Sequence, residues 1–395
     1  MTWETVLLGD VLKTSAGGTP LKSKKEYYEG GDIPWLMSGE VCRRDIISSV
    51  NKITKLGVEN SSAKVFPINT TLVAMYGATA GQVGILRFPS ATNQAVCGIL
   101  PNSNYLPEFL YYYLTHYKKT LLLEASGVAQ PNLSQIKIKN VPIPKISIQE
   151  QQKIVIKLDA IFGEIDKAIV AIEANAKNSE ALFESYLTEV FERGGEGWIS
   201  TVLDKVCKVD RGSSPRPIKD YFTDSAEGVN WIKIGDTEEG GKYIFSTKQK
   251  ITKEGAEKSR YVEAGDFILT NSMSYGRPYI MRTNGYVHDG WFVLRLNKDI
   301  DSEYFYYLLT SPYVQNQFNS LAAGSVVKNI SGDLVKKTIL PIPSLNEQKK
   351  LAEIFSEKQA ILERLSDVYT DKANEMRMLK ESTLNQAFSG ELVKE

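Results

Sequence analysis

The chain has 395 residues, 42% of them hydrophobic and 24% charged, with equal numbers of acidic and basic residues. This length is enough for two domains, and the composition is that of a soluble globular protein without low-complexity tracts. No apolar run approaches the ~20 residues of a membrane span, the N-terminus carries no export signal, and three isolated cysteines exclude a zinc site or disulfide framework, so a cytoplasmic location is expected.

Charge is distributed unevenly along the chain. Subtracting Asp and Glu from Lys and Arg gives +5 for residues 1–147, −5 for 148–197, +2 for 198–343 and −2 for 344–395. Two basic segments therefore alternate with two acidic ones. The neutral total says nothing about the partners of either kind.

The first basic segment has the pattern of an α+β domain. Residues 71–77 (TLVAMYG) and 82–88 (QVGILRF) are alternating apolar stretches bounded by Gly and Pro, which predicts strands. Residues 107–116 (PEFLYYYLTH) have a helical period and are expected in the core or an interface. Pro-Ile-Pro at 142–144 ends the strand before the acidic segment.

The first acidic segment predicts a long helix over residues 149–193. Ser147 and Glu150 have the capping-box spacing, in which each side chain satisfies a backbone N–H of the first turn. Such a helix spans about 65–70 Å and cannot bury its apolar stripe within one small domain. The apolar steps average 3.5 residues and predict a seam for a partner helix: Ile154, Leu158, Ile161, Ile165, Ala168 and Ile172.

The second half of the chain repeats the first at a spacing of 194–199 residues. DIPWLMSGEV (32–41) matches GVNWIKIGDT (228–237), and PEFLYYYLT (107–115) matches SEYFYYLLT (302–310). Further strands are predicted at 266–272 and 291–296. A second helix is expected to start with a capping box at Ser344 and Glu347, and its seam would contain Leu351, Ile354, Lys358, Ile361, Leu365 and Val368.

The repeat predicts the architecture. We expect two globular α+β domains, 1–147 and 198–343, and two helical regions, 148–197 and 344–395. Because neither helix can bury its seam alone, the natural partner of each is the other. Pseudo-two-fold symmetry would set them antiparallel as a coiled coil, with one globular domain at each end.

Catalytic motifs are missing from the sequence. The two histidines, His116 and His288, are not equivalent in the repeat, and no HExxH, GxSxG or P-loop occurs. GDTEEGGKY (235–243) has one residue too many for a P-loop, and SPY (311–313) lacks the second proline of a methyltransferase tetrapeptide. We therefore expect no catalytic residues and no metal site in this chain.

Polar loops with glycine and basic residues recur in both copies and indicate DNA binding. TSAGGTPLKSKKEYY (14–28) corresponds to VDRGSSPRPIKDYF (209–222), YGATAGQVG (76–84) to SMSYGRPYI (272–280), and ASGVAQPNLS (125–134) to AAGSVVKNIS (322–331). Lys and Arg suit phosphates, and Arg, Lys, Asn, Gln, Ser and Thr can pair with base edges. The backbone pattern is kept while the polar tips change, as reading two different short sequences requires.

These residues resemble the specificity subunit of type I restriction–modification systems, along essentially the whole chain. The resemblance rests on the duplicated order, on the G-x-T/S-P turns at Gly18–Pro20 and Gly212–Pro215 that precede Trp35 and Trp231, and on the P-I-P…E-Q helix starts. It implies that each globular domain is a target recognition domain for one half of a split, asymmetric DNA sequence, with the helices holding the two domains apart.

The resemblance also implies partners and cofactors. Modification (methyltransferase) subunits would dock on the helical regions, bring S-adenosylmethionine and methylate adenine N6 of double-stranded DNA. Restriction subunits, with ATP and Mg, would add translocation and cleavage. The base flipping that methylation requires would fall to the partner. This chain would bind no cofactor directly.

Residue roles follow from the chemistry of the loops. The expected phosphate positioners are Lys22, Lys24, Lys25, Arg211, Arg216 and Lys219. The expected base readers are Gln82, Arg87, Asn93, Gln94, Gln130, Asn132, Ser274, Arg277, His288, Asp289, Lys328 and Asn329. Further DNA-contacting residues are expected at Thr19, Ser38, Tyr76, Thr79, Ser213, Ser214, Lys233, Asn271, Ser272 and Tyr275.

Two other functions remain open from the residues alone. A standalone DNA-modifying enzyme would transfer methyl groups or cleave DNA as a purified chain. A scaffold with two ligand-binding heads on a coiled coil would bind no duplex, or would bind one without the salt sensitivity of phosphate contacts.

Overall fold

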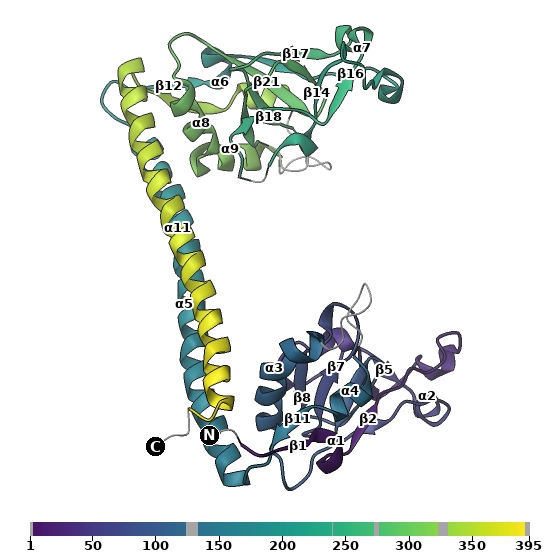
Figure 1. Cartoon of the computed structure of the whole chain (residues 1–395). Coiled ribbons are helices and arrows are strands. Elements are labelled where there is room, and N and C mark those ends of the chain that lie inside the picture. Colours follow the sequence, from purple (N-terminus) through teal and green to yellow (C-terminus); the bar gives the residue numbers. More distant parts are fainter. Residues whose placement is uncertain (1–2, 124–132, 239, 272–275, 323–330, 392–395) are drawn as a thin grey trace. The chain divides into compact units, whose positions relative to one another are not determined.

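The computed structural model describes residues 3–123, 133–238, 240–271, 276–322 and 331–391 (Figure 1). The chain forms two compact units. Unit 1 consists of residues 1–172 with 371–395, and unit 2 of residues 173–370. None of the helices in the described residues is long and apolar enough to cross a membrane.

Unit 1 contains three sheets. A five-stranded sheet has the order β2 (Thr14–Ala16), β10 (Val96–Ile99), β7 (Thr71–Ala74), β8 (Val83–Leu86), β4 (Asp45–Ile46). A four-stranded sheet has the order β5 (Lys52–Ile53), β3 (Ile33–Leu36), β9 (Ser90–Thr92), β6 (Val65–Phe66). A two-stranded sheet pairs β1 (Thr5–Leu7) with β11 (Pro142–Pro144). The helices are α1 (Leu8–Val11), α2 (Lys55–Glu59), α3 (Pro107–Leu123), α4 (Gln135–Lys139), and the 3-10 turns η1 (Lys25–Tyr27), η2 (Ser38–Glu40) and η3 (Gly77–Thr79).

Unit 2 repeats this topology strand for strand. Its five-stranded sheet has the order β13 (Cys207–Arg211), β21 (Trp291–Leu296), β18 (Phe267–Thr270), β19 (Pro278–Met281), β15 (Tyr243–Ile244). Its four-stranded sheet has the order β16 (Gln249–Ile251), β14 (Val229–Ile232), β20 (Gly285–Val287), β17 (Arg260–Val262), and β12 (Ile199–Val202) pairs with β22 (Ile339–Ile342). The helices are α6 (Leu203–Val206), α7 (Lys253–Glu257), α8 (Ser302–Thr310), α9 (Pro312–Ala322), α10 (Gly332–Lys336), η4 (Ile218–Tyr221) and η5 (Ile234–Asp236).

The central strands are buried on both faces, because helices cover one face and the four-stranded sheet covers the other. Val73 of β7 packs in one cluster with Phe109 of α3, whereas the neighbouring Leu72 packs with Leu36 of β3 and Phe66 of β6. All four residues of β7 are buried. The predicted strands at 71–77, 82–88, 266–272 and 291–296 are thereby confirmed as β7, β8, β18 and β21, and the α+β class is confirmed with them.

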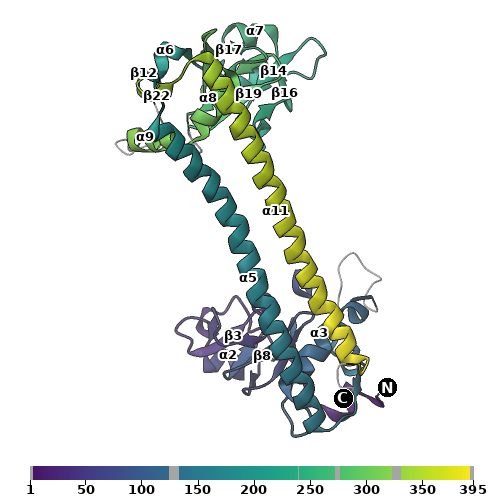
Figure 2. The ribbon, with the colours of Figure 1, turned by 90° about the vertical axis from the view of Figure 1, so that its left-hand side faces the viewer.

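Two long helices are shared between the units: α5 (Ile148–Arg193) begins in unit 1 and ends in unit 2, and α11 (Leu345–Phe388) runs the other way (Figure 2). The first capping box is complete, since Ser147 N donates to Glu150 (2.9 Å) and Glu150 N to the Ser147 hydroxyl (3.3 Å). The second is half formed. Glu347 N donates to the Ser344 hydroxyl (3.4 Å), but the Glu347 carboxylate accepts a hydrogen bond from the Trp198 indole instead (2.8 Å).

The two helices pack antiparallel, as predicted. In unit 2 the ring of Phe191, near the end of α5, lies 5.6 Å from Phe355, near the start of α11. In unit 1 Lys380 of α11 forms an ion pair with Asp166 of α5 (2.5 Å).

The predicted seam of α11 is wrong at three of its apolar positions, which alternate along it. Ile354, Ile361 and Val368 are 40%, 49% and 60% exposed. Ala352 and Phe355 face the core of unit 2 in their place, at 5% and 0% exposure. The helix therefore buries a different apolar face from the one that the 3.5-residue steps select.

Candidate nucleic-acid interface

In unit 1 the predicted loops meet where four strands end. Gly17, after β2, donates its N–H to Val96 at the start of β10 (2.9 Å). Asn93, after β9, donates to Leu36 at the end of β3 (2.8 Å), and Met75, after β7, donates to Ala95 (2.7 Å). These backbone bonds gather the segments after β2, β3, β7 and β9 at one edge of the two sheets. We call this edge interface 1.

The same edge forms in unit 2. Gly212, after β13, donates to Trp291 at the start of β21 (2.8 Å), and Asn271, after β18, donates to Gly290 (3.0 Å). Ser213 N donates to Val287 at the end of β20 (3.3 Å). We call this edge interface 2.

Candidate residues far apart in the sequence bond to each other at both interfaces. At interface 1 the Thr19 hydroxyl donates to Oε1 of Gln94. At interface 2 the Ser214 hydroxyl donates to Oδ1 of Asp289 (2.6 Å). Each pair is 75 residues apart in the chain, so the repeat brings equivalent positions together and places an amide in one copy and a carboxylate in the other.

Asp289 is held as a charged acceptor. The hydrogen bond from Ser214 lowers the pKa of Asp289 below its ordinary value, and Arg216, whose Nη2 lies 3.3 Å from Oδ2, acts in the same direction. Asn271 supports the same turn, because its buried side-chain amide donates to the backbone carbonyl of Asp289 (2.6 Å). Asp289 therefore keeps its charge at neutral pH and offers acceptor oxygens.

Two of the expected base-reading residues, Asn93 and His288, lie within the turns and stabilise their backbone. Asn93 is only 6% exposed, and its Oδ1 accepts from Ala95 N (3.2 Å). Burial lowers the pKa of His288 below its ordinary value, so the imidazole is neutral at pH 7, and its Nδ1 accepts from Gly290 N (2.8 Å). Both side chains bond to the backbone of the turn that carries them.

The G-x-T-P turn at Gly18–Pro20 and the tryptophan that follows it, Trp35, are connected by a hydrogen bond. The Trp35 indole on β3 donates to the carbonyl oxygen of Gly18 (3.0 Å) and is itself 5% exposed. The turn before Pro20 is thus tied to the middle of the four-stranded sheet. This contact holds Thr19 where it meets Gln94.

The expected phosphate positioners are all exposed: Lys22, Lys24, Lys25, Arg211, Arg216 and Lys219. Among the other candidates Tyr76 is 39% exposed, and Ser38, Thr79, Gln82, Ser213, Lys233 and Arg277 are half-buried. The guanidinium of Arg277 lies over the Tyr279 ring (5.6 Å). Candidates outside the described residues are Gln130, Asn132, Ser272, Ser274, Tyr275, Lys328 and Asn329.

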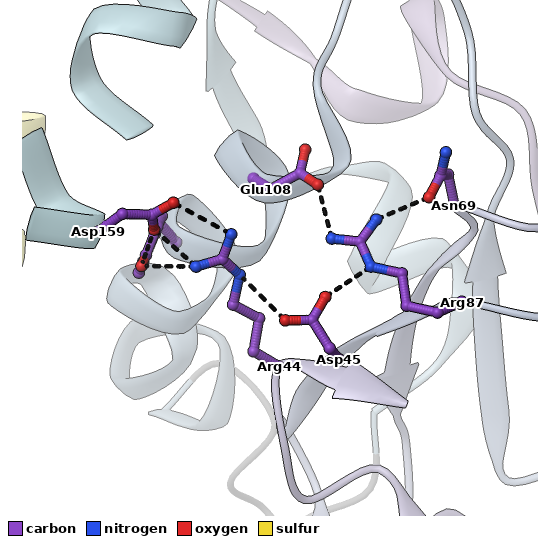
Figure 3. Close-up of polar contacts among 7 residues, drawn as sticks. Arg44, Asp45, Asn69, Arg87, Glu108 and Asp159 are labelled. Atoms are coloured by element: carbon purple, nitrogen blue, oxygen red, sulfur yellow. Dashed lines mark hydrogen bonds and ion pairs between the residues drawn. The ribbon is translucent and has the colours of Figure 1, made fainter. Parts of the chain in front are cut away.

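Arg87 is separated from the other candidates. It follows the end of β8 that lies opposite the interface, because β7 and β8 are antiparallel and only the start of β8 is level with the end of β7. Its guanidinium is bound by Asp45 (2.5 Å), Glu108 (2.6 Å) and Asn69 (2.6 Å), as Figure 3 shows. We therefore leave Arg87 out of the interface.

Other basic residues reach the interfaces that the loop patterns did not reveal. Lys64 donates to the Ser15 hydroxyl beside interface 1 (3.1 Å). At interface 2 Arg260 donates to the Arg211 carbonyl (3.2 Å), and Ser213 donates to the Lys258 carbonyl (3.0 Å). In the sequence these residues are marked only as basic residues that follow a short helix, α2 or α7. Their closeness to the interfaces depends on how distant strands pair in the sheet, which the local sequence does not reveal.

The interfaces are polar surfaces at strand ends, rich in hydrogen-bonding groups and cations. Within the part of the chain that the structure describes, no group of three or more His, Cys, Asp and Glu side chains is arranged to hold a metal ion. The chemistry that the described residues support is recognition by hydrogen bonds and charge.

Comparison with known proteins points to one family. The family model described as "Type I restriction modification DNA specificity domain" matches residues 1–174 and again residues 195–368. The MjaIX type I restriction enzyme specificity subunit of Methanocaldococcus jannaschii is 31% identical over 239 residues, which are 56% of this chain and 55% of that protein. The match thus spans about half the length of that relative. The MjaVIII specificity subunit of the same organism is 24% identical over 99% of this chain and 93% of its own length.

Solved structures share the fold. A chain from a structure titled as showing the assembly and conformational transition of the type I R-M system has a TM-score of 0.73 at 19% identity, covering 99% of this chain and 98% of its own. The HsdS subunit of Thermoanaerobacter tengcongensis has a TM-score of 0.58 at 19% identity and covers 98% of this chain and 97% of its own.

Proposed function

The chain belongs to the family of type I restriction–modification DNA specificity domains, and from this premise we propose that it is the specificity subunit of a type I restriction–modification complex. Interface 1 reads one half of a split DNA sequence and interface 2 reads the other. The chain selects the sequence and performs no chemistry of its own.

The observation that carries this proposal is the paired interface. Gln94 and Asp289 occupy equivalent places on equivalent backbones. An amide offers both donors and acceptors, whereas a carboxylate offers acceptors alone. The two interfaces therefore suit different base edges in the major groove, where cytosine shows an amino donor and adenine a donor beside an acceptor. The target is accordingly asymmetric.

Phosphate contacts provide affinity and make it sensitive to salt. We expect the triple replacement of Lys22, Lys24 and Lys25 by Ala to weaken binding to any duplex, because each phosphate contact releases counterions. The slope of log K against log salt should become less steep by about 2.7, at ~0.9 for each of the three lysines replaced. Fluorescence anisotropy of a labelled duplex across a salt series measures this slope.

The matched control for this triple variant removes three other exposed lysines of unit 1. Lys145 follows β11, and Lys153 and Lys167 lie on α5, outside the loops that form interface 1. Their replacement by Ala should leave the slope unchanged. Equal slopes for the two triple variants would contradict the assignment of residues 22–25 to phosphate.

Modification subunits dock on the long helices in this proposal. Ile354, Ile361 and Val368 recur every seven residues on α11 and are exposed, which is the pattern of a helix face that packs against another helix. In unit 2 Ile361 lines an apolar groove with Leu182 and Phe183 of α5. The partner on this face would carry S-adenosylmethionine and methylate adenine N6, and restriction subunits would use ATP and Mg.

Replacing Ile361 by Glu is expected to weaken assembly with the modification subunit by about a hundredfold, because a charge would be buried in an apolar contact. DNA recognition by the free chain should not change. The control is Ala360→Glu, which adds the same charge at the adjacent exposed position on another side of the helix. Analytical ultracentrifugation of the mixed subunits measures assembly. Equal affinities for both variants would contradict docking on the face that carries Ile361.

One experiment tests the proposed function as a whole. The chain is co-expressed with the modification subunit of its own system in a host without adenine methylation, and methylated adenines are mapped by single-molecule sequencing. We expect one split, asymmetric motif. Methylation or cleavage by the purified chain alone would favour a standalone enzyme, and duplex binding that is absent or insensitive to salt would favour a scaffold without a DNA partner.

A further inference from the structure

A chain of alternating charges leads from the five-stranded sheet of unit 1 to α5 (Figure 3). Arg87, after β8, is bound by Asp45 of β4 (Nε–Oδ1, 2.5 Å) and by Glu108 of α3 (Nη2–Oε1, 2.6 Å). Asp45 also faces Arg44 (Oδ2–Nε, 3.7 Å). Arg44 in turn reaches Asp159 of α5 with both of its terminal nitrogens, Nη1 to Oδ1 at 2.6 Å and Nη2 to Oδ2 at 3.3 Å. The sheet, α3 and α5 are joined by direct contacts between charges.

The contact between Arg44 and Asp159 constrains an angle as well as a distance. Two nitrogens of a planar guanidinium bind two oxygens of a planar carboxylate, so rotation of the sheet on the helix breaks at least one bond. Tyr112 of α3 takes part as well, since its hydroxyl accepts from Arg44 Nη1 (3.2 Å) and donates to Asp159 Oδ1 (2.5 Å). We call this set of contacts among Arg44, Tyr112 and Asp159 the joint of unit 1. The Arg44 side chain is 28% exposed, which limits its screening by solvent.

Unit 2 makes the equivalent joint without a charge on the long helix. Lys242 stands where Arg44 stands in unit 1 and forms its ion pair with Glu303 of α8, the counterpart of Glu108. Its ammonium also lies 5.2 Å from the centre of the Tyr307 ring. The α11 position equivalent to Asp159 is Ser356, which bonds to the Tyr307 hydroxyl. A single neutral hydrogen bond fixes a relative angle less strictly than a two-pronged ion pair.

The joint of unit 1 is connected to interface 1 along the chain. Residues 38–46 run from η2, which borders the interface, to β4, which carries the joint. The start of this segment is held in place, because the Glu40 carboxylate accepts from Met37 N (2.8 Å) and from Val50 N (2.9 Å). The angle at which Arg44 meets α5 therefore sets the angle at which interface 1 is presented on the helix.

We propose that Arg44 is a positioning residue of DNA recognition, which through Asp159 fixes interface 1 on α5 and thereby limits the spacing between half-sites that the complex accepts. The inference rests on the proposed function. Arg44 touches no base in this scheme. Its removal should loosen the spacing between the half-sites and leave the bases of each half-site unchanged.

The test maps methylated adenines in a methylation-free host that co-expresses the modification subunit with the wild-type chain, Arg44→Ala, Asp159→Asn or Ser356→Ala. The wild type should give one spacing. Arg44→Ala should keep both half-site sequences and raise the share of sites one base pair longer or shorter by about tenfold, the scale expected for removing a charge-assisted bond. Ser356→Ala, the matched change in unit 2, should keep the single spacing.

The possible outcomes distinguish a failure of the role proposed for Arg44 from a failure of the proposed function. A wild-type complex that methylates no split sequence would overturn the proposed function. A split motif with the same single spacing for Arg44→Ala would overturn only the role of Arg44, and so would a change in the bases of a half-site, because that would make Arg44 a reader. If Arg44→Ala fails to fold, the nearly isosteric Asp159→Asn decides: broader spacing supports the joint and unchanged spacing refutes it.

Discussion

Replacing Gly212 by Ala is expected to weaken recognition of one half-site by about a hundredfold while unit 1 stays folded. A Cβ at residue 212 would lie 2.0 Å from the carbonyl oxygen of His288 and 2.9 Å from its carbonyl carbon. These are backbone atoms of the turn that carries Asp289, so they cannot move without displacing the acceptor that interface 2 presents. Gly17 has the same environment in the first copy, where a Cβ would lie 2.3 Å from the Asn93 carbonyl oxygen.

The expected cost in stability is modest compared with the cost in function. Overpacking of this kind costs about 1–3 kcal/mol of folding free energy, whereas site-specific binding should fall by about a hundredfold, because displaced donors and acceptors no longer match the base edges. Site-specific methylation by the assembled complex and gel shift on the mapped target measure the effect. Gly163→Ala is the control, since a Cβ there meets nothing within 4 Å and Gly163 lies on α5, outside the interface loops. Equal methylation by the two variants would show that the turn at Gly212 does not belong to the interface.

The repeat could be predicted from the sequence together with much of the fold, because equivalent positions recur with the same residue types. β7 and β18 were predictable from short apolar alternation between turn residues, and the first helix start from Ser147 and Glu150. The pairing of Thr19 with Gln94 was not predictable, although both were named as candidates. A contact over 75 residues depends on the parallel pairing of β3 with β9, and no local pattern encodes that pairing.

The errors have physical reasons. On α11 two apolar faces compete, and periodicity alone cannot tell which one the chain covers. Phe355 packs against the rings of Tyr186 and Phe191 of α5, and the face of α11 that carries Ile361 stays exposed. Arg87 looked like a reader because it follows a strand near polar loops, but its partners are Asp45 and Glu108, 42 and 21 residues away.

A buried glutamine lies at the start of each long helix. In the sequence it is visible only as part of the P-I-P…E-Q motif, which does not reveal its hydrogen bonds. Gln151 is 0% exposed. Its Oε1 accepts from Leu106 N (2.9 Å), and its Nε2 donates to the carbonyl oxygens of Asn104 (2.8 Å) and Ile146 (3.2 Å). Gln348 makes the same set of bonds in unit 2, to Asp301 N (2.8 Å) and to two carbonyl oxygens. One amide thus binds the loop before α3 or α8 to the start of a long helix.

Gln151→Leu is expected to lower the free energy of unfolding of unit 1 by about 3–5 kcal/mol, because it leaves three buried backbone groups unpaired at ~1–3 kcal/mol each. The shift of the first transition in urea, followed by fluorescence, measures this decrease. Gln152→Leu is the control: it is the adjacent glutamine on the exposed side of α5 and should change stability by less than about 0.5 kcal/mol. The assignment fails if both variants unfold at the same urea concentration.

Gln151→Glu separates the donated bonds from the accepted one. A carboxylate can still accept from Leu106 N, but it cannot donate to the carbonyls of Asn104 and Ile146. The protonated carboxyl group can donate to one of them, so the folded state raises the pKa of residue 151 above the ~4.3 of an unfolded glutamate. The stability that residue 151 contributes in this variant, measured relative to Gln151→Leu at each pH, is therefore greatest below pH ~4.3 and is lost as the pH rises through the raised pKa. A pH-independent decrease in the stability of Gln151→Glu would mean that side-chain shape, and not the two donated hydrogen bonds, joins the recognition domain to its helix.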